Sequence, residues 1–306
     1  MKNKSIILIA GITLCAVVLA GAFMFNSSST LDQFQPTVTD PLTKAKEFNS
    51  QNALDFAKTI CSLGPRYGGN DAELKAADSM EAEFKNNGIN TYKEKVDLGN
   101  GKYTYNVVGE IKGSENPERY IIVGSHIDSP GFCEGATDDA AAMGIQTEMA
   151  RTLSTGYRPK QTVLIVGFGG EEMWFKGSDA FVKSHPNIVK NCEAMIDLNC
   201  VGAGQQVSLI GHSNQPKPVN GDPKLIDIMK QNAKQLGYTA VTGTTTYPSD
   251  TYPFYYNSDK VPVLQVMSQP FEVAPWSSAN TFDKLNSKDM NKIGQTVTMT
   301  VLNLTV

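Results

Sequence analysis

The chain has 306 residues, of which 41% are hydrophobic and 19% charged, and its formal net charge is −4. These values are ordinary for a soluble globular protein, and beyond about the first forty residues the length suits one large α/β domain with a single core. No basic stripe runs along the sequence, so we expect no nucleic-acid partner.

The N-terminus carries the first local signal. Lys2 and Lys4 precede an apolar run, residues 6–25, that contains no charged residue. Roughly 20 apolar residues can span a bilayer's hydrocarbon core, and the small residues 20–22 suit a cleavage site. We therefore expect residues 1–25 to be a signal anchor or a cleaved signal peptide, and the only membrane-contacting segment. The rest would then be extracellular, either at the cell surface or secreted.

Four cysteines follow that segment, and residues 26–45, rich in Ser, Thr, Pro and Asp, indicate a linker. An even number of cysteines outside the cell permits two disulfides, although their spacing specifies no pairing. They are Cys61, Cys133, Cys192 and Cys200.

Residues 46–306 alternate helix-like and strand-like segments. The predicted helices are 53–62, 72–87, 140–153 and 225–236, and the predicted strands are 103–111, 120–123, 162–168 and 261–267. Short, β-branched apolar strands are typical of strands buried on both faces. The alternation predicts an α/β fold of three layers, with a mostly parallel mixed sheet and helices on both faces.

Ligands of such sheets bind beyond the carboxyl ends of the strands, and polar residues follow several strands here. His126 and Asp128 come just after 121–123, as a metal ligand and its orienting partner would, or as a purely structural pair. Asp138 and Asp139 precede a helix made of small residues, where they can be caps or ligands.

Two further strand ends carry acids. Glu171 and Glu172 follow a strand and two glycines, a pattern in which one glutamate can bind a cation while the other acts as general base. Asp197 and Asn199 are two residues apart and share a face if the strand continues. Converging carboxylates must protonate or bind cations, so the simplest interpretation is a divalent metal.

The order of these motifs, over residues 64–285, resembles the M28 family of zinc exopeptidases and the related glutaminyl cyclases. The segments that carry the resemblance are Gly64-Pro65-Arg66, 124–129, 135–139, 168–172 with Gly177-Ser178, 249–254 and 280–285. The resemblance implies a zinc-exopeptidase-like fold and an aminopeptidase that hydrolyses peptides with a metal-activated water, using one or two zinc ions.

Carried over by position, the resemblance implies a role for each site residue. His126 would bind one metal, Glu172 the second, and Asp138 would bridge the two. Glu171 would be the general base and Asp128 would orient His126. The free N-terminus of a peptide substrate would then lie against the acidic site.

Two positions depart from the family pattern. Asn199 stands where an aspartate ligand is expected, and the final histidine is replaced by Trp276 or Ser277. Neither Trp276 nor Ser277 is a good zinc ligand. Asn199 can still bind through its carbonyl oxygen, and Asp197 can substitute for it if the strand bulges.

The two remaining histidines and three aromatic residues complete the candidates. His212 is a possible replacement ligand, whereas His185, next to Pro186, is expected at the surface. Tyr252 and Trp276 are candidate substrate-binding residues, together with Phe254, although core packing explains such aromatic residues equally well.

Three functions remain open from the sequence. The first is an active metallo-aminopeptidase, favoured by the retention of both Glu171 and Glu172. The second is a catalytically degenerate surface binding protein, favoured by the replaced ligands. The third is a glutaminyl-cyclase-like acyltransferase with one zinc, which 135–138 and 261–264 favour slightly.

Overall fold

The computed structural model describes residues 40–305. The predicted signal or anchor segment, residues 1–25, lies outside this range, as does most of the predicted linker. Within residues 40–305 no helix is both long enough and apolar enough to cross a membrane.

An eight-stranded mixed sheet forms the centre of the domain, in the order β1-β2-β4-β3-β5-β8-β6-β7. The strands are β1 Asn90–Gly99, β2 Lys102–Ile111, β3 Asn116–His126, β4 Gln161–Phe168, β5 Cys192–Leu198, β6 Gly204–Ser213, β7 Ala240–Thr245 and β8 Val263–Phe271. The four central strands β4, β3, β5 and β8 are mutually parallel, whereas β2 and β6 run antiparallel to their central neighbours. The ends of β3, β4 and β5 therefore meet at one edge of the sheet.

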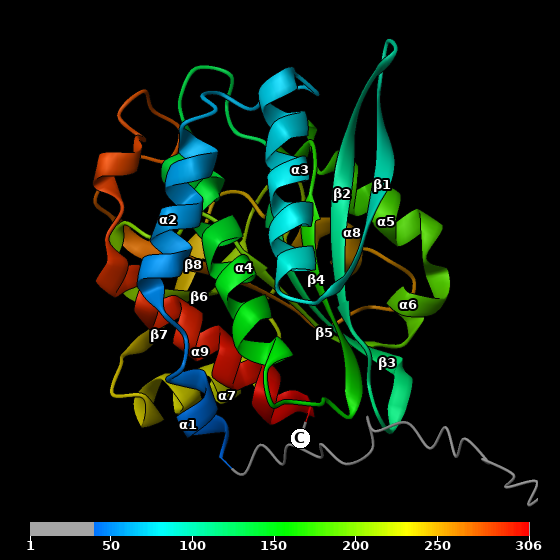
Figure 1. The fold of residues 1–306 in the computed structure, drawn as a ribbon, viewed down its shortest axis with the longest axis vertical. Coiled ribbons are helices and arrows are strands. Elements are labelled where there is room, and N and C mark those ends of the chain that lie inside the picture. The colour runs from blue at the N-terminus through cyan, green and yellow to red at the C-terminus, as the bar shows by residue number, and fades with distance from the viewer. Residues whose placement is uncertain (1–39, 306) are drawn as a thin grey trace, which may run out of the picture. The chain divides into compact units, whose positions relative to one another are not determined.

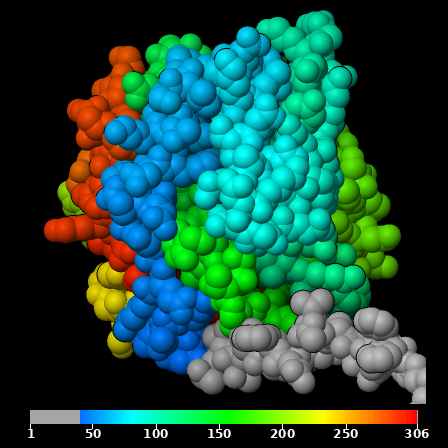
Figure 2. Space-filling view, in the orientation of Figure 1, coloured from blue at the N-terminus to red at the C-terminus, as the bar shows by residue number. Residues whose placement is uncertain are grey.

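Helices cover both faces of the sheet (Figure 1). On one face lie α2 Ser50–Cys61, α3 Asp71–Asn86, α4 Ala141–Ser154, α7 Pro223–Gln235 and α9 Ser287–Thr305, and on the other α5 Lys176–Ser184, α6 Pro186–Lys190 and α8 Thr251–Tyr255. Figure 2 shows α2 and α3, blue and cyan, side by side over the first face, with α4 in green between them.

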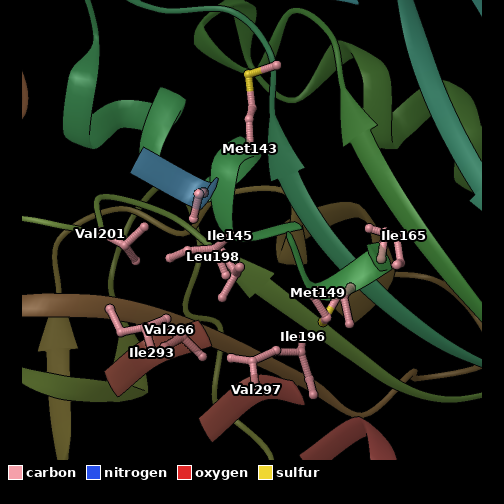
Figure 3. Packing of buried hydrophobic residues seen from close by; sticks show 14 of the residues in the cluster. Met143, Ile145, Met149, Ile165, Ile196, Leu198, Val201, Val266, Ile293 and Val297 are labelled. Atoms are coloured by element: carbon pink, nitrogen blue, oxygen red, sulfur yellow. The ribbon is translucent and has the colours of Figure 1, made fainter. Parts of the chain in front are cut away.

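The core is divided by the sheet into two layers, because alternate residues of a strand point to opposite faces. In β3, Ile121 and Val123 pack into the larger cluster under α2, α4 and α9, while Ile122 packs into the smaller cluster under α5 and α8. Figure 3 shows part of the larger cluster, in which Met149 and Ile165 join Ile196 and Val297. The predicted three-layer α/β fold and the burial of both sheet faces are confirmed.

The segment before α2 is more ordered than the predicted linker. Residues 41–45 form helix α1, Pro41–Ala45, with Asp40 accepting from the backbone N–H of Leu42 and Thr43, and Pro41 in the first turn. This N-cap and proline are the usual helix-start signals, so the linker prediction was wrong for residues 41–45.

None of the four cysteines among residues 40–305 forms a disulfide. Cys61, Cys133, Cys192 and Cys200 are all buried and free. Two disulfides were possible from the even number alone, but the fold does not pair them.

Candidate active site

His126 is the last residue of β3, and its ring is completely buried among acids. Nε2 lies 3.0 Å from Oδ1 of Asp138, and Nδ1 lies 3.1 Å from the main-chain oxygen of Asp128 and 3.4 Å from Oδ1 of the same residue. When Nδ1 donates to Asp128, Nε2 is the nitrogen that faces Asp138 and is available to a metal. The structure thus brings together His126, Asp128 and Asp138, as the sequence predicted.

Asp128 also holds the loop that carries the two glutamates. Its Oδ1 accepts from the backbone N–H of Glu171 at 2.9 Å, and its Oδ2 accepts from that of Glu172 at 3.0 Å. These bonds fix a short 3₁₀ turn, Glu171–Met173, directly after β4 and next to His126. One carboxylate therefore connects the histidine to the glutamate turn.

Asp138 and Asp139 lie in an irregular turn, Ala136–Ala140, that leads into α4. Both side chains are buried, and Oδ2 of Asp139 accepts from the backbone N–H of His126 at 3.1 Å. Asn280 supports the turn from a distant segment, because its Oδ1 accepts from the N–H of Thr137 at 2.8 Å. Neither aspartate caps α4 with its side chain, so the capping alternative is wrong.

The acids of the site are difficult to ionise in the absence of a cation. Burial raises the pKa of Glu171 to about 8, although the charge of His126 opposes the shift. Burial and the neighbouring Asp138 raise the pKa of Glu172 to about 10. Burial alone would lower the pKa of His126, but the charges of Glu171 and Asp139 outweigh it and raise that pKa well above its usual value. Excess negative charge is therefore the dominant property of the site.

Asp197 lies in β5 and Asn199 directly after it, and Ser249 is a neighbour of both. Asn199 donates from Nδ2 to Oγ of Ser249 at 2.8 Å. Asp197 is fully buried in β5, neither of its oxygens has a hydrogen-bond partner, and burial raises its pKa to about 7. The pairing of β5 with β8 is regular through residues 195–198, so the bulge that would let Asp197 replace Asn199 is not present.

Asp250 is an additional buried acid that the sequence analysis did not single out. It is completely buried and accepts from Oγ of Ser178 at 2.5 Å, and both burial and the charge of Asp197 raise its pKa. The only sequence signal was its place in the segment 249–254, which resembled a loop near the family's substrate pocket.

The structure also gives the surroundings of His212, Trp276 and Phe254. His212 bonds to Oδ1 of Asn220 and of Asn214 at the surface, so its proposal as a replacement ligand was wrong. Trp276 is 63% exposed, with its ring 6.1 Å from that of Phe132. Phe254 is fully buried between Phe168 and Phe181 and belongs to the core.

The remaining histidine is structural. His185 is half-buried after α5, bonds through Nε2 to Glu94 at 2.6 Å and packs on the ring of Phe181. It is less exposed than predicted because β1 brings Glu94 to it.

Arg66 is a buried residue whose role was not predicted. Its guanidinium donates to the main-chain oxygens of Ile127, Glu134 and Gly135 at 2.6–3.1 Å. The five donors of arginine suit such a set of acceptors. Arg66 therefore fixes the segment between His126 and Asp138, which no local pattern around residue 66 could show.

The donors of the site fit a divalent cation. Zinc bonds of about 2.0–2.2 Å at a tetrahedral angle place two ligand atoms about 3.3–3.6 Å apart, a few tenths of an ångström more than the 3.0 Å between His126 Nε2 and Asp138 Oδ1. Across residues 40–305, however, no three His, Cys, Asp or Glu side chains are grouped to hold a metal as they stand. A third donor must rotate inward, and Oε1 of Glu172 is shielded from water and has no hydrogen-bond partner.

Comparison with known proteins identifies the family and the fold. The family model "Peptidase family M28" matches residues 106–301. Among solved structures, an aminopeptidase from Aneurinibacillus sp. strain AM-1 superposes with a TM-score of 0.72 at 17% identity, covering 87% of this chain and 96% of the other. The glutaminyl cyclase of Porphyromonas gingivalis superposes with a TM-score of 0.69 at 20% identity, covering 84% of this chain and 99% of the cyclase.

Curated relatives match over a shorter length. A probable zinc metalloprotease of Pyrenophora tritici-repentis is 36% identical over 104 residues, which are 31% of this chain and 24% of that protein. The chain thus spans about a quarter of the length of the curated relatives it matches first. The family match covers most of the domain that contains the site, and the chain belongs to peptidase family M28.

Proposed function

We propose that this protein is a zinc-dependent exopeptidase that removes N-terminal residues from peptides and binds a single metal ion. The observation that carries the proposal is the contact of His126 with Asp138 beside two glutamates whose pKa values are raised. The curated zinc metalloproteases and the aminopeptidase fold support the same class.

One ion is proposed because three donors remain once Asn199 and Trp276 stand at two of the expected ligand positions, and among residues 40–305 these three are not yet grouped around a metal as they stand. His126, Asp138 and Glu172 would hold it, and when bound it would polarise the scissile carbonyl and lower the pKa of a bound water. The two positions that would complete a separate set for each of two ions hold Asn199 and Trp276, of which the first bonds to Ser249 and the second is exposed.

The remaining residues position and move protons. Asp128 would keep Nδ1 of His126 protonated, so that Nε2 stays available. Glu171 would accept a proton from water and return it to the leaving amine. The surplus carboxylates would attract the ammonium group of a free peptide N-terminus and favour substrates that carry one.

The test combines metal content and turnover. Purified protein is assayed for zinc by mass spectrometry and for hydrolysis of aminoacyl chromogenic substrates, with Glu171→Gln as the matched variant. We expect about one zinc per chain in both proteins, and a loss of turnover of 10²-fold or more in Glu171→Gln, as for removal of a general base.

Other outcomes would identify the alternatives. No bound metal, and no turnover in added zinc or cobalt, would favour the degenerate binding protein. Turnover of an N-terminal glutamine peptide to a cyclic product without hydrolysis would favour the acyltransferase, an activity that the name of one structural neighbour records.

We further propose that the domain works outside the cytoplasm, attached by residues 6–25 or released after cleavage within 20–22. The apolar run behind Lys2 and Lys4 supports this location. Cell fractionation with N-terminal sequencing of the mature protein tests it, and a cytoplasmic protein that retains Met1 would contradict it.

A further inference from the structure

Two consecutive aromatic residues after the glutamate turn have left-handed backbones. Trp174 has φ +67° and ψ +57°, and Phe175 has φ +60° and ψ +35°. Bulky residues rarely adopt this region, because their Cβ crowds the following carbonyl oxygen, at a cost of roughly 1–2 kcal/mol per residue. Backbone bonds from Phe175 N–H to Glu171 O and from Lys176 N–H to Gly170 O fix the turn.

Packing explains Phe175 but not Trp174. Phe175 is 8% exposed and lies 5.5 Å, ring to ring, from Tyr252, whereas Trp174 is 66% exposed. A glycine would adopt the backbone of residue 174 without strain. Within the described chain, the Trp174 ring gains little burial to offset its unfavourable backbone, and such outliers occur preferentially at ligand sites.

The Trp174 ring forms one wall of a groove of about 470 Å³, a volume typical of small-ligand sites. The groove is lined by Trp174, Phe175, Asp179, Val182, Lys183, Pro216, Tyr252, Pro253, Tyr256, Asn257 and Ser258. Its aromatic rings are contiguous. The ring of Phe175 packs against that of Tyr252, and the centres of the Tyr252 and Tyr256 rings are 4.8 Å apart. We call this cavity the aromatic groove.

Two chain segments connect the aromatic groove to the candidate active site. Trp174 is two residues beyond Glu172, and Tyr252 is two residues beyond the buried Asp250. The lining of the groove therefore includes residues of the two loops that carry acids of the site.

The charges around the aromatic groove indicate the kind of side chain it accepts. Asp179 and Lys183 neutralise each other at 2.5 Å, and Lys217 lies over the Tyr256 ring with Nζ 5.6 Å from its centre. Within residues 40–305 the lining thus has no unpaired carboxylate to attract lysine or arginine, while its flat rings favour an aromatic partner in edge-to-face or offset contact.

We propose that the aromatic groove binds an aromatic side chain at one of the first two positions of the peptide substrate, with Trp174 as the main specificity residue. This inference rests on the proposed exopeptidase function for its substrate class. Its test is a binding measurement that needs no turnover, so the failure of one proposal is distinguishable from the failure of the other.

The experiment uses the two tryptophans of the chain, Trp174 and Trp276. In a Glu171→Gln, Trp276→Phe background, Trp174 is the sole tryptophan and its fluorescence reports on the groove. The probes are Phe-Ala-Ala-Ala, Ala-Phe-Ala-Ala, their lysine counterparts and tetra-alanine. We expect one phenylalanine peptide to shift the emission and to bind at least tenfold more tightly than tetra-alanine and both lysine peptides.

Isothermal titration of Trp174→Gly in the Glu171→Gln background provides the second arm. The tenfold preference should disappear while Tm stays equal or rises, because glycine relieves the strained backbone. Phe271→Ala, which removes an exposed ring outside the groove, should keep the preference. Equal affinities for all peptides, or a retained preference in Trp174→Gly, would overturn the proposal. A Tm several degrees lower in Trp174→Gly would also overturn it, because the ring would then serve packing.

Discussion

Asp128 shows how a single buried residue links separate parts of the site. Its carboxylate accepts two backbone N–H bonds from the glutamate turn and also lies beside Nδ1 of His126. A buried carboxylate without a basic partner is unfavourable, but here each oxygen has a donor. The position of Glu171 relative to His126 thus depends on Asp128, although the two are 45 residues apart in sequence.

Asp128→Asn, which replaces one carboxylate oxygen by an NH₂ group, tests whether the glutamate turn depends on Asp128. The amide keeps one acceptor oxygen, so one of the two N–H groups loses its partner, at a cost of about 1–3 kcal/mol. We expect the free energy of unfolding of the metal-free protein, measured in urea, to fall by that amount. Ser79→Ala, at a half-buried position of α3 away from the site, should change it by about 0.5 kcal/mol or less. An unchanged free energy of unfolding in Asp128→Asn would show that the two bonds are dispensable.

Among the secondary-structure elements, α4 packs closely against α2. It follows the turn that carries Asp138, and it crosses α2 at Gly144, where a Cβ atom would lie 2.1 Å from the carbonyl oxygen of Ala53. Because the obstacle is backbone, a side-chain rotation cannot relieve the overlap. The small residues at the start of α4 therefore serve close helix packing as well as the site.

Gly144→Ala separates helix propensity from packing. Alanine favours a helix over glycine by about 1 kcal/mol, but moving α4 away from α2 should cost more, since overpacking typically costs about 1–3 kcal/mol. We expect Tm to fall, and metal affinity to fall with it because Asp138 moves with α4. A higher Tm would mean that the two helices separate easily and that the close crossing is unimportant.

The three layers of the domain, and the presence of acids at the carboxyl ends of the strands, could be predicted from the sequence because both follow from local patterns. Buried strands appear as short apolar runs, and parallel strands bring their carboxyl ends together. The conformation of Trp174, the burial of Asp250 and the bonds of Arg66 could not be predicted in this way. Each depends on contacts between distant segments, such as that of Arg66 with Ile127, which are 61 positions apart in the sequence.

For the whole molecule, the buried acids make stability dependent on pH. The folded pKa values of Asp197, Glu171 and Glu172 are about 7, 8 and 10, all above the ordinary values of 3.8–4.5. A carboxyl group whose pKa is raised by folding binds its proton more tightly in the folded state. The resulting stability is complete below the unfolded pKa and is lost as pH rises through the folded pKa. His126, whose pKa is also raised, contributes in the same direction.

We therefore expect the Tm of protein treated with a chelator to fall between pH 5 and pH 9, when measured by differential scanning fluorimetry. Zinc should reverse much of this fall at the upper end, because it binds the deprotonated carboxylates and stabilises only the folded state. Asp197→Asn supplies the matched control, since it removes one buried acid with almost no change of shape. Its metal-free form should lose less Tm over the same range than the parent protein. A Tm that rises with pH in chelator would contradict the argument, because it would mean that the acids are ionised in the folded state and stabilised by partners other than a metal.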